Sequence, residues 1–266
     1  MKYKSVYLDG SKENIISDNI PENEFQNVKK YIKSIQEMMM EMDYYIIVRN
    51  NVGDFLNYAD RDDIKTMEDF INLNRLFMNW LNTFYTWIEY HERRYNLFKS
   101  KLKSEYFDNV YWYRMAYFLR THTTHNSWCI KRTEMRLIDG KVRYMIDADD
   151  LLKDEKINKT VRKDLLKIKE ETGSIEAKKF TEEFFLAFEK IQIELWQNEM
   201  GNMQNVIDEL GKYVKVENGK VFPSYIQSDE GLKRPLCTSF TFSKMNEKLQ
   251  LMIRLSKEKI FENEIG

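Results

Sequence analysis

Proline, glycine and cysteine are all scarce in this chain. Its 266 residues include only 3 prolines, 9 glycines and 2 cysteines. So few turn-forming residues leave little material for the many tight loops of an all-β fold. The cysteines, Cys129 and Cys237, lie far apart and fit no zinc-ligand spacing, so we interpret them as reduced thiols of the core. A disulfide between them is the alternative.

The chain also lacks an excess of either charge and lacks long apolar runs. It has 42 lysines and arginines against 43 aspartates and glutamates, so the net charge gives no argument for a polyanionic partner. No run of eighteen apolar residues occurs, and the amino terminus has no signal-peptide pattern. We therefore expect a cytoplasmic protein that neither crosses nor binds a membrane.

The common catalytic and metal-binding motifs are missing too. The sequence has no glycine-rich phosphate loop, no nucleophile elbow and no Cys/His zinc pattern. These absences argue against the common ATPases, hydrolases and zinc proteins, and we expect no cofactor and no bound metal. Asp147, Asp149 and Asp150 suggest a divalent cation, but capping of the helix that begins there is the simpler interpretation.

Helical periodicity dominates what is present. From Thr66, a predicted N-cap with Asp69 three residues on, apolar residues recur every three or four positions as far as Leu102. A second, aromatic-rich helix is predicted from about 105 to 120, antiparallel to the first after a reversal near Ser104. Further helices are predicted over 22–42, 149–155, 160–172, 174–210 and 244–261.

Short β elements complete the predicted fold. Strands are predicted at 3–8, 43–49 and 239–242, and hairpins at the Asp139-Gly140 and Asn218-Gly219 turns. Gly173 is expected to end one helix, Ser174 to cap the next, and Gly201 to mark a break in it. The predicted fold class is mainly α, an antiparallel helical bundle with small β-hairpin decorations.

Three regions are predicted along the chain, and no linker or repeat separates them. They are a small N-terminal α/β segment (1–61), a helical bundle (62–212) with an inserted hairpin (129–146), and a C-terminal hairpin with a closing helix (213–266). Because no flexible linker is found, we expect one compact body.

Arg120 and His125 are the candidate catalytic pair. Histidine has an ordinary pKa near neutrality, so it can take a proton from a ribose 2′-hydroxyl or return one to a leaving oxygen. Arginine offers a fork of donors to the phosphate. The pair therefore suits metal-free cleavage of RNA, in which the substrate supplies the nucleophile. Helical phase would set the two about 140° apart, but the threonines after Arg120 weaken a helix, and a bend there would turn both toward one cleft.

Four further residues are candidates for supporting roles. His122, Thr124 and Asn126 are close to the pair in sequence. His91 should stand opposite residue 117 on the neighbouring helix if the chain reverses near Ser104. The alternative for His91, which is on an apolar stripe, is a core histidine hydrogen-bonded to a buried tyrosine.

A longer motif surrounds the pair. It reads Tyr113-Arg114-Met115-Ala116-Tyr117-Phe118-Leu119-Arg120-Thr121-His122-Thr123-Thr124-His125. This run resembles the HEPN superfamily, whose hallmark is an arginine, four to six residues and a histidine near the end of a helix in an antiparallel bundle. It is most similar to bacterial members in which a β-hairpin follows. The specific resemblance covers 113–125, and a general likeness of pattern extends over 66–172.

The resemblance implies a metal-independent endoribonuclease of a toxin or antiviral (abortive-infection) system. Arg120 would bind the scissile phosphate and His125 would be the acid and base, in a homodimer that brings two motifs to one cleft. The implied partners are RNA, a second copy of the chain, and an antitoxin or regulatory protein. The motif departs from the family at Thr121, where Asn, Asp or His is usual, and at His122, which takes the place of a tyrosine.

Two alternatives belong to other functional classes. One is a non-catalytic helical dimer that acts as an interaction or regulatory module. The other is a metal-dependent nuclease that uses the aspartates near 147–150.

Overall fold

The computed structural model describes most of the chain. The described residues are 2–9, 11–61, 64, 66–94, 103–125, 127–135, 142–217, 220–222, 224–228, 233–237 and 250–251. The predicted turns at Asp139-Gly140 and Asn218-Gly219, the strand 239–242 and nearly all of the helix 244–261 lie outside them. The end of the first long helix, beyond Arg94, lies outside them as well.

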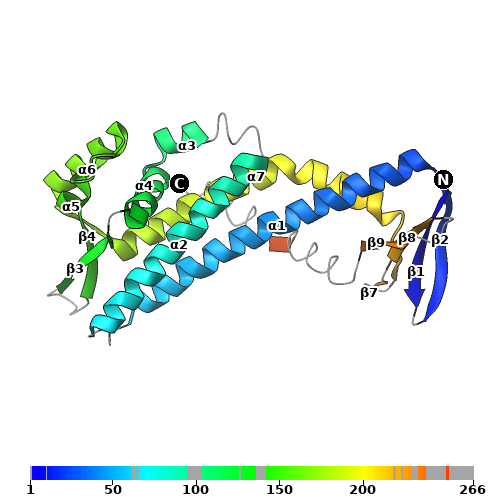
Figure 1. Ribbon diagram of the computed structural model, residues 1–266, viewed down its shortest axis with the longest axis horizontal. Helices are drawn as coiled ribbons and strands as arrows, with labels where there is room; N and C mark the ends of the chain where they lie inside the picture. The colour runs from blue at the N-terminus through cyan, green and yellow to red at the C-terminus, as the bar shows by residue number, and fades with distance from the viewer. Residues whose placement is uncertain are drawn as a thin grey trace, which may run out of the picture. The chain divides into compact units, whose positions relative to one another are not determined.

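Helices make up most of the described residues, which confirms the mainly α prediction (Figure 1). They are α1 (Glu22–Ala59), α2 (Met67–Arg94), α3 (Lys103–Asn109), α4 (Tyr111–His125), α5 (Ala148–Leu152), α6 (Lys159–Glu171) and α7 (Ala177–Gly211). The strands are β1 (Tyr3–Asp9), β2 (Lys12–Ile20), β3 (Ile130–Met135), β4 (Val142–Asp147), β5 (Ser174–Glu176), β6 (Val216–Glu217), β7 (Lys220–Val221), β8 (Ser224–Ser228) and β9 (Lys233–Cys237). None of the described helices has the length and apolar character that crossing a bilayer requires.

The chain forms two compact units. The terminal unit contains residues 1–42 and 192–266, and the central unit contains residues 43–191. These boundaries fall inside α1 and α7, whereas the predicted regions divide the chain after residues 61 and 212.

The terminal unit is built on an antiparallel sheet with the strand order β2-β1-β8-β9. Tyr3 of β1 stands opposite both Ile20 of β2 and Ser228 of β8, so the start of the chain pairs with a segment more than two hundred residues later. The Tyr3 ring stacks on Phe25 of α1 at 3.9 Å, and its hydroxyl donates to Glu22. The predicted strand 3–8 is confirmed, and β2 and β8 were not predicted.

The predicted strand 43–49 is wrong, because these residues continue α1. Val48, Val52 and Phe55 are each no more than 1 % exposed. Their spacing of four and three residues puts them on one face of a helix. Aromatic and β-branched residues make this stretch look like a strand, but burial of the helical stripe outweighs that local preference.

Helix α2 begins as predicted and carries the core of the central unit. The Asp69 amide donates to Thr66 Oγ1 at 3.1 Å, and the Thr66 amide donates to Asp69 Oδ2 at 3.1 Å, which is a reciprocal capping box. Further along α2, Trp80 and Phe84 are fully buried. Their rings meet Phe184 of α7 at 4.6 and 4.7 Å between centroids.

Helix α4 ends five residues later than predicted, and the expected bend after Arg120 does not occur. The Thr121 hydroxyl donates to the Tyr117 carbonyl at 3.1 Å, and the Thr124 hydroxyl donates to the Arg120 carbonyl at 2.9 Å. Threonine side chains bonded in this way are accommodated within the helix. The predicted helix from 105 is instead interrupted at Val110, between α3 and α4.

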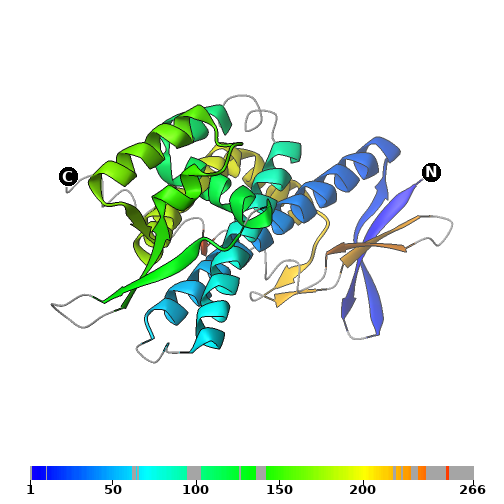
Figure 2. The same cartoon turned by 60° about the vertical axis from the view of Figure 1, so that its left-hand side comes forward.

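A three-stranded sheet of order β3-β4-β5 lies in the central unit, and Figure 2 shows its hairpin beside the helices that follow it. The hairpin strands β3 and β4 were predicted. Gly173, at φ 73°, donates to the Ile168 carbonyl at 2.8 Å and ends α6 as expected. Ser174, however, belongs to β5, where it pairs with Asp147 of β4, and it does not cap α7. Helix α7 continues through Gly201, where a break was expected.

Candidate functional site

One face of α4 lines a pocket of about 600 Å³ in the central unit. The residues are Phe118, Thr121, His122 and His125. Their spacing of three, four and seven residues from Phe118 puts them on a single stripe of the helix. Because α4 continues to its last residue without bending, both histidines reach the same hollow.

The opposite wall is the loop between α5 and α6. Lys153, Asp154, Glu155 and Lys156 line the pocket from this loop, together with Ser127, Lys131 and Asp150. Both flanking helices are capped by side chains. Asp147 accepts from the Asp149 amide at 3.0 Å at the start of α5, and Asn158 accepts from the Thr160 amide at 2.8 Å at the start of α6. The Asn158 cap fixes the end of the loop at which α6 begins.

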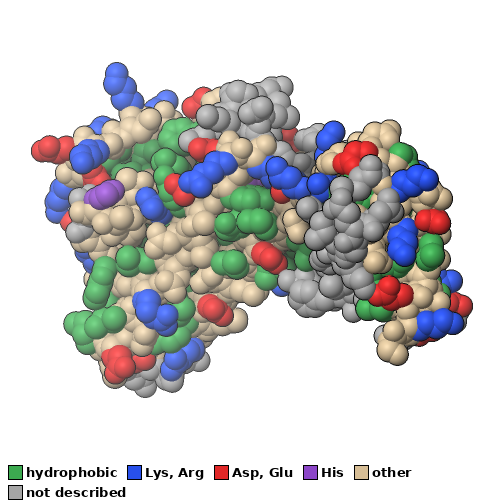
Figure 3. Space-filling view, turned by 45° about the vertical axis from the view of Figure 1, so that its right-hand side comes forward, with side chains coloured by type: hydrophobic (Ala, Val, Ile, Leu, Met, Phe, Trp, Pro, Cys, Tyr) green, Lys and Arg blue, Asp and Glu red, His purple; other side chains and the backbone are tan. Residues whose placement is uncertain are grey.

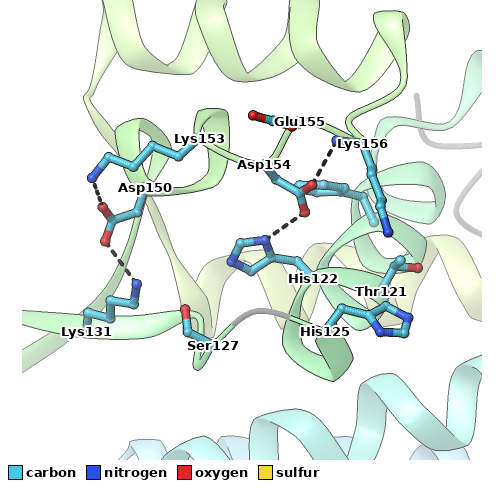
Figure 4. Close-up of a pocket in the computed structure, with 11 residues that line it drawn as sticks. Thr121, His122, His125, Ser127, Lys131, Asp150, Lys153, Asp154, Glu155 and Lys156 are labelled. Atoms are coloured by element: carbon cyan, nitrogen blue, oxygen red, sulfur yellow. Dashed lines mark hydrogen bonds and ion pairs between the residues drawn. The ribbon is translucent and has the colours of Figure 1, made fainter.

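His122 and Asp154 form a buried hydrogen-bonded pair across the pocket (Figure 4). His122 Nδ1 lies 3.1 Å from Asp154 Oδ2, and the two side chains are 6 % and 11 % exposed. An ionised carboxylate only accepts, so the proton of a neutral His122 ring is on Nδ1, and Nε2 is its acceptor nitrogen. Asp154 Oδ1 also accepts from the Lys156 amide at 3.0 Å, which fixes the carboxylate from the other side.

His125 is the exposed histidine of the pocket. It lies three residues beyond His122, a separation that places Cβ atoms about 5–6 Å apart on one helix face. Within the part of the chain that the structure describes, no group is hydrogen-bonded to its imidazole. Figure 4 shows the Lys156 ammonium reaching down from the loop toward Thr121 and His125. On the face of the molecule drawn in Figure 3, a histidine side chain reaches the surface among lysine or arginine side chains.

Some of the charged side chains around the pocket form ion pairs and others do not. Lys153 and Lys131 both bind the Asp150 carboxylate, at 2.6 and 3.1 Å, and these two hydrogen bonds lower the pKa of Asp150. Lys156 forms no ion pair with any described residue. The Glu155 carboxylate lies on the side of the loop away from His125 in Figure 4. Lysines and carboxylates are equal in number here, so any attraction for an anion comes from their arrangement.

Arg120 does not line this pocket. It lies on a different side of α4, where its guanidinium carbon is 3.8 Å from the centre of the Tyr85 ring of α2. Its Nε is buried and has no hydrogen-bond partner among the described residues. The structure therefore brings His122 and His125 together and holds Arg120 apart from them.

The other predicted supporting residues are also placed elsewhere. His91 is fully buried, and its Nδ1 donates to the Trp87 carbonyl at 2.8 Å. It does not line the pocket. Thr124 is exposed and outside the pocket, with its hydroxyl on the Arg120 carbonyl. Asn126 lies outside the described residues.

The aspartates near the start of α5 have separate partners. Asp147 is the N-cap, as the simpler interpretation predicted. Asp149 pairs with Lys169 at 2.6 Å, and Asp150 holds the two lysines. No group of three or more His, Cys, Asp or Glu side chains among the described residues is arranged to hold a metal ion.

Asp154, Lys131 and Lys156 were not predicted from the sequence. Asp154 is 32 residues from His122, so its role depends on a fold that brings the loop back onto α4. A signal was present on α4 itself. Continuing the helical stripe from Phe118 through Thr121 would have put His122 and His125 on one face.

A scan against protein-family models and searches of curated proteins and of solved structures find no match to this chain.

Proposed function

We propose that this protein is a metal-independent endoribonuclease whose acid and base are the two histidines of the α4 pocket. The observation that carries the proposal is the placement of two imidazoles on one helix face, one of them held by a buried carboxylate. Cleavage of RNA by its own 2′-hydroxyl needs two proton transfers, one from the nucleophile and one to the leaving group. Two histidines can supply both near neutral pH.

His122 is the proposed base. Its acceptor Nε2 takes the proton of the 2′-hydroxyl, and the 2′-oxygen attacks phosphorus. The bond from phosphorus to the 5′-oxygen breaks, and protonated His125 gives that oxygen its proton. The products are a 2′,3′-cyclic phosphate and a 5′-hydroxyl. Asp154 stabilises the positive charge that forms on His122, as a carboxylate behind a general base does.

Lys156 is the proposed phosphate-binding cation. Negative charge grows on the phosphate oxygens in the transition state, and a fixed cation beside them lowers the barrier. Lys156 thus takes the role that the resemblance to HEPN proteins implies for Arg120. RNA cleavage of this kind fits the toxin or antiviral setting, with a homodimer and a restraining antitoxin or regulatory partner.

The test is RNA cleavage in the presence of excess EDTA. Purified protein should convert a fluorescently labelled single-stranded RNA into fragments with 2′,3′-cyclic phosphate ends. His125→Ala should abolish these ends, whereas Thr124→Ala, its exposed neighbour outside the pocket, should cleave normally. Cleavage that is lost on chelation, or that survives in His125→Ala, contradicts the proposal.

A non-catalytic helical dimer is the second candidate. The observation that favours it is the packing of Arg120 on Tyr85, which separates the arginine from the histidine of the HEPN-like motif. Intact RNA after incubation with a protein that sediments as a tight dimer would support this alternative.

A further inference from the structure

Trp128 is an exposed aromatic residue that adjoins the pocket in the sequence. Its side chain is 43 % exposed, whereas Trp80, Trp87 and Trp196 are at most 2 % exposed. It directly follows Ser127, which lines the pocket, and precedes β3, which carries Lys131. A large ring is thus left open to solvent one residue from a pocket that contains two histidines and Lys156, a lysine with no ion pair among the described residues.

The backbone that follows Trp128 in the sequence is buried and hydrogen-bonded. Cys129 and Ile130 are 4 % and 0 % exposed. The Ile130 amide donates to Asn74 Oδ1 at 3.2 Å, and Asn74 Nδ2 donates to the Ile130 carbonyl at 3.0 Å. This two-way clamp joins the start of β3 to α2. The indole is therefore carried on a fixed backbone, and its exposure is not that of a loose loop tip.

We infer that Trp128 stacks on an unpaired base of single-stranded RNA next to the phosphate held in the pocket, an inference that rests on the proposed function. An indole offers a flat apolar face on which any base can stack, and cations nearby hold the sugar–phosphate backbone. Lys156 supplies such a cation within the pocket. In a duplex both faces of each base are already covered, so the same contact is denied to paired RNA. The substrate class is therefore single-stranded RNA, with little preference for sequence.

Binding is measured with a substrate that cannot be cleaved. A short, fluorescein-labelled 2′-O-methyl oligoribonucleotide of mixed sequence is titrated with the protein, as a single strand and as a duplex with its complement, while the fluorescence anisotropy of the label is recorded. The single strand should bind and quench the tryptophan emission of the wild type, and the duplex should bind more weakly. Trp128→Ala should weaken binding of the single strand by about 5- to 140-fold, the range expected for loss of one stacked base.

Two further variants separate stacking from simple loss of apolar surface. Trp128→Phe keeps an aromatic face and should retain most of the affinity. Leu186→Ala removes another exposed apolar side chain, 56 % exposed on α7, and should leave binding unchanged. Circular dichroism of each variant checks that it is folded.

The outcomes distinguish this inference from the proposed function. Cleavage of RNA by the wild type together with full oligonucleotide affinity in Trp128→Ala overturns the stacking role alone. Stacking-dependent binding without cleavage overturns the nuclease and supports the role of Trp128. Equal affinity for single strand and duplex overturns the substrate class. A dimer that dissociates in Trp128→Ala with unchanged RNA affinity also overturns the inference, and assigns the indole to a contact between copies of the chain.

Discussion

The Arg114 guanidinium donates two parallel hydrogen bonds to the Asp164 carboxylate. Arg114 Nε lies 2.6 Å from Asp164 Oδ2, and Nη2 lies 3.1 Å from Oδ1. Arg114 Nη1 also donates to the Asp108 carbonyl at the end of α3 at 2.9 Å. This one side chain joins α4, which carries both pocket histidines, to α6, which begins directly after the loop that forms the opposite wall.

Breaking that pair should destabilise the protein strongly. The two side chains are only 10 % and 19 % exposed, so removal of one leaves a charge with little water around it. We expect Arg114→Met to lower the free energy of unfolding by about 3–5 kcal/mol in urea titrations. The double variant Arg114→Met/Asp164→Leu should recover part of the loss, because it leaves no uncompensated charge. A loss below about 1 kcal/mol, the value of an exposed pair, would show that the pair does not brace the fold.

Asp154→Asn should slow RNA cleavage with little effect on folding. The amide carries no charge to stabilise a protonated His122 and does not enforce the Nδ1 tautomer. We expect kcat to fall by about 100- to 10,000-fold, the usual range for impaired acid–base catalysis. Asp149→Asn, an exposed aspartate paired with Lys169, is the matched control and should keep normal activity. Equal rates in the two variants would remove Asp154 from the mechanism.

The pH dependence of cleavage should be bell-shaped. The rate should fall in acid as the base becomes protonated and fall in alkali as the acid loses its proton. Initial rates between pH 5 and pH 9 check this, and a rate that keeps rising with pH across that range would remove the proposed acid from the mechanism.

Arg120→Ala should affect stability more than catalysis. Arg120 packs against the Tyr85 ring, and a desolvated contact of this type contributes about 0.5–2 kcal/mol. We expect a loss of that size in chemical denaturation, with kcat close to the wild-type value. Abolished cleavage in a variant of unchanged stability would instead restore the arginine–histidine pairing that the motif suggests.

Asn74→Ala should loosen the start of β3. The substitution removes both partners of the Ile130 backbone at once, and each buried group left unsatisfied costs about 1–3 kcal/mol. Thermal unfolding should report the loss, and hydrogen exchange of the Ile130 amide should accelerate. Asn72→Ala, two residues earlier and only partly buried, should change stability little.

Cys129 should be unreactive in the folded protein. Burial raises the pKa of its thiol to about 12, so almost no thiolate exists at pH 8. In a Cys237→Ser background, a disulfide-exchange reagent should modify Cys129 only after denaturant is added. Above pH about 9 the unfolded thiol loses its proton and the folded thiol keeps it, so stability falls as pH rises. Rapid modification of the native protein would contradict the burial.

Two helix ends were predicted correctly because they depend on hydrogen bonds between residues close together in the sequence. The capping box at Thr66 and the left-handed glycine at Gly173 both lie where the sequence indicated. The segment 43–49 was misassigned because its aromatic and β-branched residues suit a strand, and only burial of a continuous helical stripe decides against it. Strand β8 was missed because it pairs with β1 from the other end of the chain. Strand β2 forms a local hairpin with β1, but its residues are mostly polar and give no clear strand pattern.

The histidines of the candidate site could be predicted from the sequence, but the residues on the opposite wall could not. His122 and His125 were recognised as chemically apt residues, but the expected bend at Thr121 broke the phase that puts them on one face. The helix instead continues through Thr121 to His125, with threonine hydroxyls bonded to carbonyls of the preceding turn. Asp154 and Lys156 enter through a loop whose path depends on how α5 and α6 pack, and no local pattern specifies that.

Every residue that lines the pocket belongs to the segment from Phe118 to Lys156. Contacts between residues so near in sequence close at low entropic cost and form quickly. The pocket should therefore form early when the chain refolds, before the strands from the two ends of the chain pair with each other. In a partly denatured sample, hydrogen exchange should show α4 and the α5–α6 region opening together as one cooperative block.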